Sequence, residues 1–240
     1  MIDAAELTPD TAVLEIGPGH GALTGELLKT GNRVIAIEKD DALYAELKDT
    51  FASELTTGGL TLLHADALDV TPESLGLQTR SFALIANIPF NITGLLIRQW
   101  LTARPQPQSV VLLVQKEVGQ RICSRAGKES ILSLSVKAYG QPSYICTVRA
   151  GSFFPRPKVD CAVIAITNIS RNHFTNPKHE KRYFELVKAG FSSKRKQLKG
   201  NLAPVGITEE ALMSGGIDPQ ARAETLSLEA WLCLSQITSH

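Results

Sequence analysis

The stretch Ala12-Val13-Leu14-Glu15-Ile16-Gly17-Pro18-Gly19-His20-Gly21 decides the fold of this chain. It runs from a short apolar segment into a turn with three glycines, and a helix-forming segment, residues 22–30, follows directly. Glycines let the backbone of such a turn approach a ligand closely, because they carry no Cβ atom. A strand, a glycine-rich turn and a helix in this order indicate a cofactor-binding α/β domain, although nicotinamide and flavin proteins use similar turns.

The alternation of apolar strands and helices continues beyond this stretch. The expected strands are 12–16, 33–37, 60–64, 82–86 and 110–115, and the expected helices are 22–30, 41–51 and 94–101. Near-continuous apolar strands separated by helices predict a parallel sheet that is covered on both faces. Two further strands, 144–148 and 161–166, have no clear helix between them, which predicts a hairpin that closes the edge of the sheet.

The composition changes after Thr167, where a polar stretch, residues 168–178, has the character of a linker. Apolar side chains recur at a helical period beyond it, including Tyr183 and Trp231. We therefore predict an α/β, Rossmann-like domain over residues 1–167 and a small C-terminal all-helical domain over residues 168–240.

Charge is unevenly distributed along the 240 residues, whose net charge is only +1. Residues 1–167 carry 15 Lys and Arg against 17 Asp and Glu, whereas residues 168–240 carry 10 against 7. Nine of these bases lie between Arg171 and Lys199, which contain only two acids. Such a patch is the usual footprint of a phosphate backbone, and the alternative is a solvated helical face.

Composition also limits the compartment and the use of metals. No apolar run approaches the roughly 20 residues that a bilayer crossing needs, and the first residues lack the pattern of a signal peptide, so we expect a cytoplasmic protein. The cysteines are scattered, at Cys123, Cys146, Cys161 and Cys233. This spacing predicts reduced thiols and no metal site.

Three acids stand at the ends of predicted strands, at Glu15, Glu38 and Asp66. Glu38 follows Gly17 by 21 residues, a position from which an acid can accept both hydroxyls of a ribose. Asp66 could accept from an adenine amine of a cofactor, and Glu15 could order the loop or balance positive charge on the ligand. For each acid the alternative is a helix N-cap or a solvated strand end.

The four residues Asn87-Ile88-Pro89-Phe90 follow the expected fourth strand and suit the methylation of an adenine amine. That nitrogen donates its lone pair to the ring, so it reacts slowly until it is held and oriented. The Asn87 side-chain carbonyl and the Ile88 backbone carbonyl, fixed by Pro89, could each accept one N–H of the amine. Phe90 could stack on the extruded base.

Taken together, these motifs make the chain similar to the ribosomal RNA adenine dimethyltransferase family, and within it to the small-subunit branch of the KsgA type. The resemblance covers nearly the whole chain and rests on Glu15–Gly21, Glu38, Asp66-Ala67, Asn87–Phe90, Ser152–Asp160, Phe191–Lys196, Gly216–Pro219 and Arg222–Glu224. It implies a Rossmann-like methyltransferase domain that binds S-adenosylmethionine. The implied cofactor-binding residues are Glu15, Gly17, Gly19, Gly21, Glu38, Lys39, Asp66, Ala67 and Asn87.

The resemblance also implies the substrate, which is a pair of adjacent adenines in a hairpin loop near the 3′ end of small-subunit ribosomal RNA. The target adenine is expected between Phe90 and Phe153, for which the alternative is a core aromatic. The expected RNA-binding residues are Lys194, Arg195, Lys196 and Lys199, and the alternative for that loop is capping of a helix. The expected partner is the small ribosomal subunit precursor, bound by a monomer.

Two departures from the family pattern leave rival interpretations open. Family members begin with a basic arm and a Gln-Asn-Phe-Leu segment that covers the cofactor, whereas this sequence opens at Met1-Ile2-Asp3, beyond that segment. Many relatives carry Tyr in place of Phe90. The rivals are a large-subunit adenine dimethyltransferase of the antibiotic-resistance type and a non-catalytic RNA-binding factor for ribosome assembly.

Overall fold

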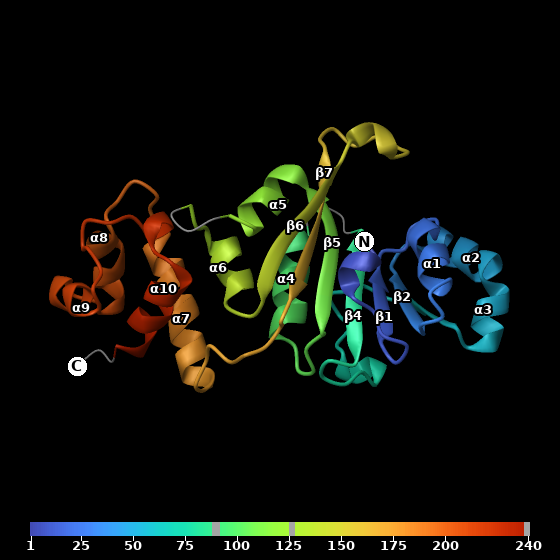
Figure 1. The fold of residues 1–240 in the computed structure, drawn as a ribbon, viewed down its shortest axis with the longest axis horizontal. Coiled ribbons are helices and arrows are strands. Elements are labelled where there is room, and N and C mark those ends of the chain that lie inside the picture. The colour runs from blue at the N-terminus through green and yellow to red at the C-terminus, as the bar shows by residue number, and fades with distance from the viewer. Residues whose placement is uncertain (88–91, 125–127, 238–240) are drawn as a thin grey trace. The chain divides into compact units, whose positions relative to one another are not determined.

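The computed structural model describes residues 1–87, 92–124 and 128–237 (Figure 1). The chain divides into two compact units. The sheet unit comprises Met1–Gly119 and Gly140–Ile169, and the helical unit comprises Gln120–Tyr139 and Ser170–His240.

The sheet unit is built on one sheet, which has seven strands among the described residues, in the order β3-β2-β1-β4-β5-β7-β6. The strands are β1 (Ala12–Ile16), β2 (Val34–Glu38), β3 (Leu60–His64), β4 (Phe82–Asn87), β5 (Ser109–Gln115), β6 (Gln141–Val148) and β7 (Cys161–Thr167). The first five strands are parallel, and β7 lies antiparallel between β5 and β6. The predicted parallel sheet with a closing hairpin is thus confirmed.

Helices follow β1, β2 and β4, as the sequence pattern predicts, whereas only a short 3-10 turn lies between β3 and β4. The helices are α1 (Ala22–Leu28), α2 (Asp41–Thr50), α3 (Ala52–Thr57) and α4 (Thr93–Thr102), with short 3-10 turns η1 (Asp3–Ala5), η2 (Glu73–Leu75) and η3 (Ala150–Ser152). Every residue of β2 is buried, as expected for a central strand covered on both faces. The first residues close one side of this core, because Ala5 is fully buried and its carbonyl accepts from Ser109 Oγ at 2.9 Å.

The helical unit contains α6 (Ile131–Lys137), α7 (Pro177–Gly190), α8 (Leu198–Leu202), α9 (Glu209–Ser214) and α10 (Leu228–Gln236), with 3-10 turns η4 (Ala203–Val205) and η5 (Ala223–Thr225). Helix α5 (Lys116–Ile122) crosses from one unit to the other. Helices α7 and α10 pack closely at Gly190, where a Cβ atom would lie 2.3 Å from the Trp231 ring. A larger residue there would force the two helices apart.

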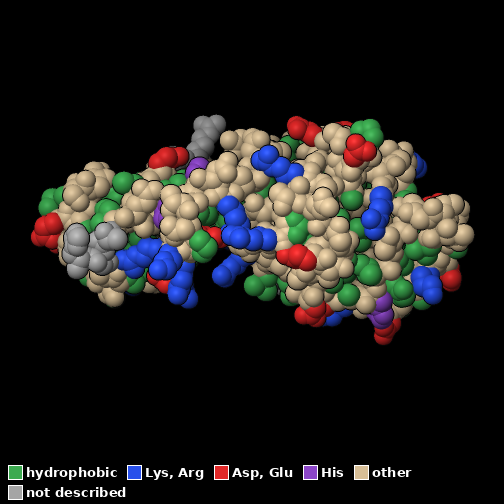
Figure 2. All heavy atoms as spheres, turned by 90° about the horizontal axis from the view of Figure 1, so that it is seen from below, with side chains coloured by type: hydrophobic (Ala, Val, Ile, Leu, Met, Phe, Trp, Pro, Cys, Tyr) green, Lys and Arg blue, Asp and Glu red, His purple; other side chains and the backbone are tan. Residues whose placement is uncertain are grey.

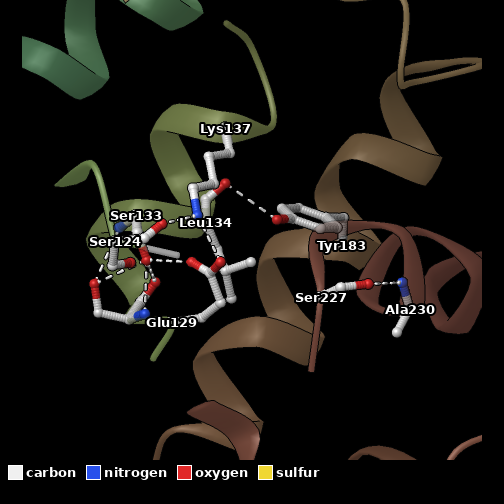
Figure 3. Close-up of polar contacts among 9 residues, drawn as sticks. Ser124, Glu129, Ser133, Leu134, Lys137, Tyr183, Ser227 and Ala230 are labelled. Carbon is white, nitrogen blue, oxygen red and sulfur yellow. Dashed lines mark hydrogen bonds and ion pairs between the residues drawn. The ribbon is translucent and has the colours of Figure 1, made fainter. Parts of the chain in front are cut away.

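The observed units differ from the sequence-based division into 1–167 and 168–240, because residues 120–139 belong to the helical unit. Figure 3 shows the polar contacts of this segment. Lys137 Nζ donates to Glu129 Oε1 at 2.5 Å, and Tyr183 on α7 donates its hydroxyl proton to the Leu134 carbonyl at 3.1 Å. The Lys137 bond lies within the segment, whereas the buried Tyr183 bond joins residues 49 positions apart and holds α6 on α7.

Candidate active site

The parallel strands bring the predicted site residues to one edge of the sheet. Ile16 at the end of β1 pairs with Ile37 on one side and with Ala86 on the other. The glycine-rich turn therefore begins between the ends of β2 and β4, where Glu38 and Asn87 stand. Ligands of open α/β sheets bind at this edge, outside the carboxyl ends of the strands.

The turn after β1 has the open backbone that its glycines predict. Gly17 and Gly19 have φ angles of 67° and 59°, in the left-handed region that favours glycine. The Gly17 N–H donates to the Ile37 carbonyl at 3.0 Å, which fixes the turn on β2. No described atom lies within 4 Å of the position that a Cβ atom on Gly19 would occupy, so the turn leaves space for a ligand.

Gly21 has a different task from the other two glycines. A Cβ atom at this residue would lie 2.5 Å from the Phe51 ring and 3.0 Å from the Leu47 side chain. Gly21 therefore allows the start of α1 to pack against the end of α2. The sequence groups Gly21 with the predicted cofactor-binding glycines, and the structure adds a packing role for it.

Glu38, which is buried, organises the backbone around the turn. Its Oε1 accepts from the N–H groups of Lys39 and Asp40 at 2.8 and 2.9 Å, and its Oε2 accepts from Gly19 N–H at 3.2 Å. A carboxylate offers about four acceptor positions. These three bonds leave one position on Oε2, which could accept a hydroxyl of a bound ligand.

Asp66, after β3, forms an ion pair with Lys39 across the ends of β2 and β3. Lys39 Nζ lies 2.7 Å from Asp66 Oδ2, and Leu68 N–H donates to Asp66 Oδ1 at 2.9 Å. The bond from Lys39, with that from Leu68, lowers the pKa of the Asp66 carboxyl, and the same pair raises the pKa of Lys39. Lys39 thus holds a site carboxylate in place, which the sequence pattern does not reveal.

Gln99 on α4 supports the same loop, and no sequence motif points to it. Its Nε2 donates to the Ala67 carbonyl at 3.0 Å and to the Val70 carbonyl at 2.9 Å. The buried Ala67 and the loop after Asp66 are therefore tied to the helix that follows the Asn87 segment. Only tertiary contacts could reveal this role, because Gln99 lies 32 residues from Ala67 and 29 residues from Val70.

Glu15 lies beneath the glycine turn and is almost fully buried. Thr24 on α1 donates to Glu15 Oε2 at 2.7 Å, which joins the first turn of α1 to β1. Burial raises the pKa of the Glu15 carboxyl to about 7, the Thr24 bond opposes this shift, and the charge of Glu38 adds to it. Both roles considered for Glu15 from the sequence, ordering the loop and balancing positive charge on a ligand, stay predictions.

This raised pKa predicts how stability depends on pH. The folded chain keeps the Glu15 proton above pH 4.5, where the unfolded chain loses it, so the free energy of unfolding falls between about pH 4.5 and 7. Glu15→Gln removes this titration and should be more stable than the wild type at pH 8, by on the order of 3 kcal/mol, but not at pH 4.5. Urea unfolding at several pH values measures the difference. An advantage of Glu15→Gln that is equal at pH 4.5 and 8 would exclude the titration of Glu15 as its cause, and exposed Glu73→Gln is the control.

Asn87 is the last residue of β4, and it is exposed at the same edge as the glycine turn. Its backbone oxygen lies 3.9 Å from the position of a Cβ atom on Gly17, so the two segments are neighbours. Ile88, Pro89 and Phe90 lie outside the described residues. Phe153, in the loop between β6 and β7, is half-buried and packs against the core of the sheet unit.

The basic residues of the helical unit fall into two groups. Lys194, Arg195 and Lys196 are exposed in the loop between α7 and α8, which Asn201 holds through bonds from its Nδ2 to the Gly190 and Ser193 carbonyls at 2.6 and 3.0 Å. Lys199 instead forms a 3.0 Å ion pair with Glu209. Figure 2 shows one face of the molecule, on which Lys and Arg side chains gather at the left, on the helical unit.

Arg171 and Arg182, like Lys199, are bound to other groups of the protein. Arg171 pairs with Glu180 at 2.5 Å, and Arg182 donates to the Val205 carbonyl at 2.8 Å. These two side chains hold the helical unit together, so the basic count of the sequence overstates the charge that is available to a ligand.

Two kinds of site are absent from the part of the chain that the structure describes. Within residues 1–87, 92–124 and 128–237, His, Cys, Asp and Glu side chains form no group of three or more that could hold a metal ion. Within the same ranges, we find no helix with the length and apolar character that crossing a membrane requires.

The strand order, with an antiparallel strand inserted beside β5, and the glycine turn beside an acid on β2 define an S-adenosylmethionine-dependent methyltransferase. The model of the ribosomal RNA adenine dimethylase family matches residues 1–239, and the chain belongs to this family. The predicted fold class and family are thereby confirmed.

Individual relatives support the same assignment. The chain is 42% identical over 241 residues to "Ribosomal RNA small subunit methyltransferase A" of Dehalococcoides mccartyi (strain CBDB1), a match that covers 98% of this chain and 81% of the relative. A dimethyladenosine transferase from Plasmodium falciparum has a similar structure, with a TM-score of 0.81, 25% identity and coverage of 97% and 91%. The 23S rRNA methyltransferase ErmE is similar with a TM-score of 0.75, 25% identity and coverage of 98% and 93%.

Proposed function

We propose that this protein transfers methyl groups from S-adenosylmethionine to the exocyclic amines of two adjacent adenines in a hairpin loop near the 3′ end of small-subunit ribosomal RNA. The observation that carries the proposal is the position of Asn87 at the end of β4, beside the open glycine turn, in a chain of this family. The small-subunit substrate is favoured over the large-subunit one because relatives named for the small subunit reach 42% identity, against 25% for the 23S enzyme.

The residues at the carboxyl edge fit the proposed cofactor. S-adenosylmethionine supplies a methyl group on a positively charged sulfur, which is open to attack by a nitrogen lone pair. Gly17 and Gly19 leave space for the side of the cofactor that would lie against the backbone of the turn. Glu38 offers one acceptor position for a ribose hydroxyl. Asp66, whose pKa the bond from Lys39 lowers, offers acceptor positions for the adenine amine.

The residues near Asn87 would hold the target base. The Asn87 side-chain carbonyl accepts one N–H of the adenine amine and aims its lone pair at the methyl group, with Ile88 and Phe90 in their expected roles. Phe153 contacts the base with the part of its ring that the core leaves open. A neutral amine that is held in this way can attack first and lose its proton afterwards, so the mechanism needs no general base.

The remaining expectations concern RNA, assembly and compartment. Lys194, Arg195 and Lys196 bind phosphates of the RNA, and Lys199 contributes less because Glu209 neutralises it. The partner is the small ribosomal subunit or its precursor, and the protein acts as a monomer in the cytoplasm.

Transfer of labelled methyl groups to unmethylated small and large ribosomal subunits, offered separately, tests the proposal when each product base is mapped. Label on two adjacent small-subunit adenines supports it. Label on a single large-subunit adenine would instead establish the resistance-type activity. Binding without transfer to either subunit would favour a non-catalytic assembly factor.

Gln99 gives a test of the cofactor site that does not require RNA. Gln99→Leu removes the bonds to Ala67 and Val70, so the loop that carries Asp66 loses its support. We expect about fivefold to tenfold weaker binding of S-adenosylhomocysteine by calorimetry, the scale of one or two hydrogen bonds. Arg98→Ala, an exposed neighbour on α4, is the control. Equal affinities of Gln99→Leu and the wild type would show that this loop does not contribute to cofactor binding.

A further inference from the structure

The loop between β6 and β7, residues 149–160, stands at the same edge of the sheet as the candidate active site. Cys161 at the start of β7 pairs with Gln115 at the end of β5, and Val148 at the end of β6 pairs with Cys161. In Figure 1 this loop, in yellow, projects beyond the ends of the strands. It therefore lies on the side from which a substrate would approach Asn87.

Hydrogen bonds at its base give the loop a defined start. Asp160 Oδ1 accepts from Ala150 N–H, and the Asp160 carbonyl accepts from Lys116 N–H, both at 3.0 Å. Ser152 N–H donates to the Arg149 carbonyl at 2.9 Å. Asp160 is the only acid of the loop, and its carboxylate thus joins the two ends of the loop.

The two phenylalanines of the loop face different surroundings. Phe153 has an extended backbone, with φ −116° and ψ 150°, in which consecutive side chains point to opposite sides. Phe153 packs against the core, and Phe154 has a relative exposure of 101%. Phe154 is therefore held out in solvent by its neighbour's packing.

Three basic residues lie within five positions of Phe154 in the sequence. Arg149, Arg156 and Lys158 are all exposed, and the structure shows no ion pair for them among the residues it describes. An aromatic ring for stacking together with unneutralised cations for phosphates is the combination that binds unpaired nucleic-acid strands. A single exposed aromatic would carry no such meaning, since scattered exposed apolar residues are ordinary.

We propose that the β6–β7 loop is an RNA-contact surface, in which Phe154 stacks on an unpaired base near the methylated adenines while Arg149, Arg156 and Lys158 bind the adjoining phosphates. The inference rests on the proposed function for the identity of the RNA. It adds to the sheet unit an RNA contact separate from Lys194–Lys196 of the helical unit.

Binding of protein-free small-subunit RNA, measured by fluorescence anisotropy at several salt concentrations, tests this surface. Phe154→Ala should weaken binding about tenfold and leave the salt slope unchanged, because no charge is removed. The triple variant Arg149→Gln, Arg156→Gln, Lys158→Gln should reduce the salt slope by about 2. Ile145→Ala, an exposed apolar residue on β6, is the matched control, and S-adenosylhomocysteine affinity should be unchanged in all variants.

Two outcomes would overturn the inference. One is wild-type affinity of Phe154→Ala for the RNA. The other is a salt slope of the triple variant equal to that of the wild type. Neither outcome bears on methyl transfer by the wild type, so failure of this inference and failure of the proposed function remain distinguishable.

Discussion

Asn87→Ala should lower the rate of methyl transfer by at least about 100-fold while leaving cofactor binding partly intact. The scale is that of losing one preorganised hydrogen-bond partner of a transition state. Asn87 is exposed at the end of β4, so its truncation opens no cavity in the core. Single-turnover transfer to small subunits measures the rate, and calorimetry with S-adenosylhomocysteine measures the cofactor affinity. Both are needed, because Asn87 is also expected near the methionine end of the cofactor.

Asn172→Ala is a suitable control for this prediction, because Asn172 is exposed in the helical unit, away from β4 in the sequence. A wild-type rate of Asn172→Ala would show that the loss of rate in Asn87→Ala is specific to residue 87. Full activity of Asn87→Ala would refute the amine-holding role. A loss confined to cofactor affinity would mean that Asn87 binds the cofactor and does not hold the target adenine.

The sheet could be predicted because each of its strands carries its own signal. Expected strands 12–16 and 60–64 match β1 and β3 residue for residue, and the other boundaries differ by at most three residues. Central parallel strands are buried on both faces, so their apolar runs are visible without any knowledge of partners. The strand ends then place Glu38, Asp66 and Asn87 at one edge by topology alone.

The roles of individual polar side chains could not be predicted in the same way. Lys39 is bound to Asp66, Gln99 to the Ala67 and Val70 carbonyls, and Lys199 to Glu209. Each contact joins residues that are distant in the sequence or on different elements. A charge count treats a paired and an unpaired lysine alike, so the sequence predicts the sign of the basic patch but not its members.

The sequence does not mark residues 120–139 as part of the helical unit, for a related reason. The chain leaves the sheet unit after Gly119 and returns at Gly140, and no composition change marks either crossing. The reason for the excursion is the packing of α6 on α7, which depends on bonds such as that from Tyr183 to Leu134. The composition change at Thr167, in contrast, lies close to the third boundary, after Ile169.

Replacing Lys194, Arg195 and Lys196 together with Ala should weaken RNA binding on the order of tenfold to a hundredfold near 0.15 M salt. It should also reduce the salt slope by about 2 to 3, because each phosphate contact releases close to one counterion. The three side chains are exposed on a loop that Asn201 shapes through backbone carbonyls, so their removal should leave the helical unit folded. Anisotropy titrations at several salt concentrations give the slope, and circular dichroism checks the fold.

Two control variants separate a local contact from a general charge effect. Lys199→Ala should reduce the slope by less than any of the three, because Glu209 already neutralises Lys199. Arg33→Ala with Lys48→Ala removes two exposed charges, one just before β2 and one in the last turn of α2, away from the carboxyl edge of the sheet, and should leave the slope unchanged. An unchanged slope in the triple variant would give this loop a structural role. An equal change in the Arg33 and Lys48 variant would mean that the RNA responds to the net charge of the protein and not to phosphate contacts of this loop.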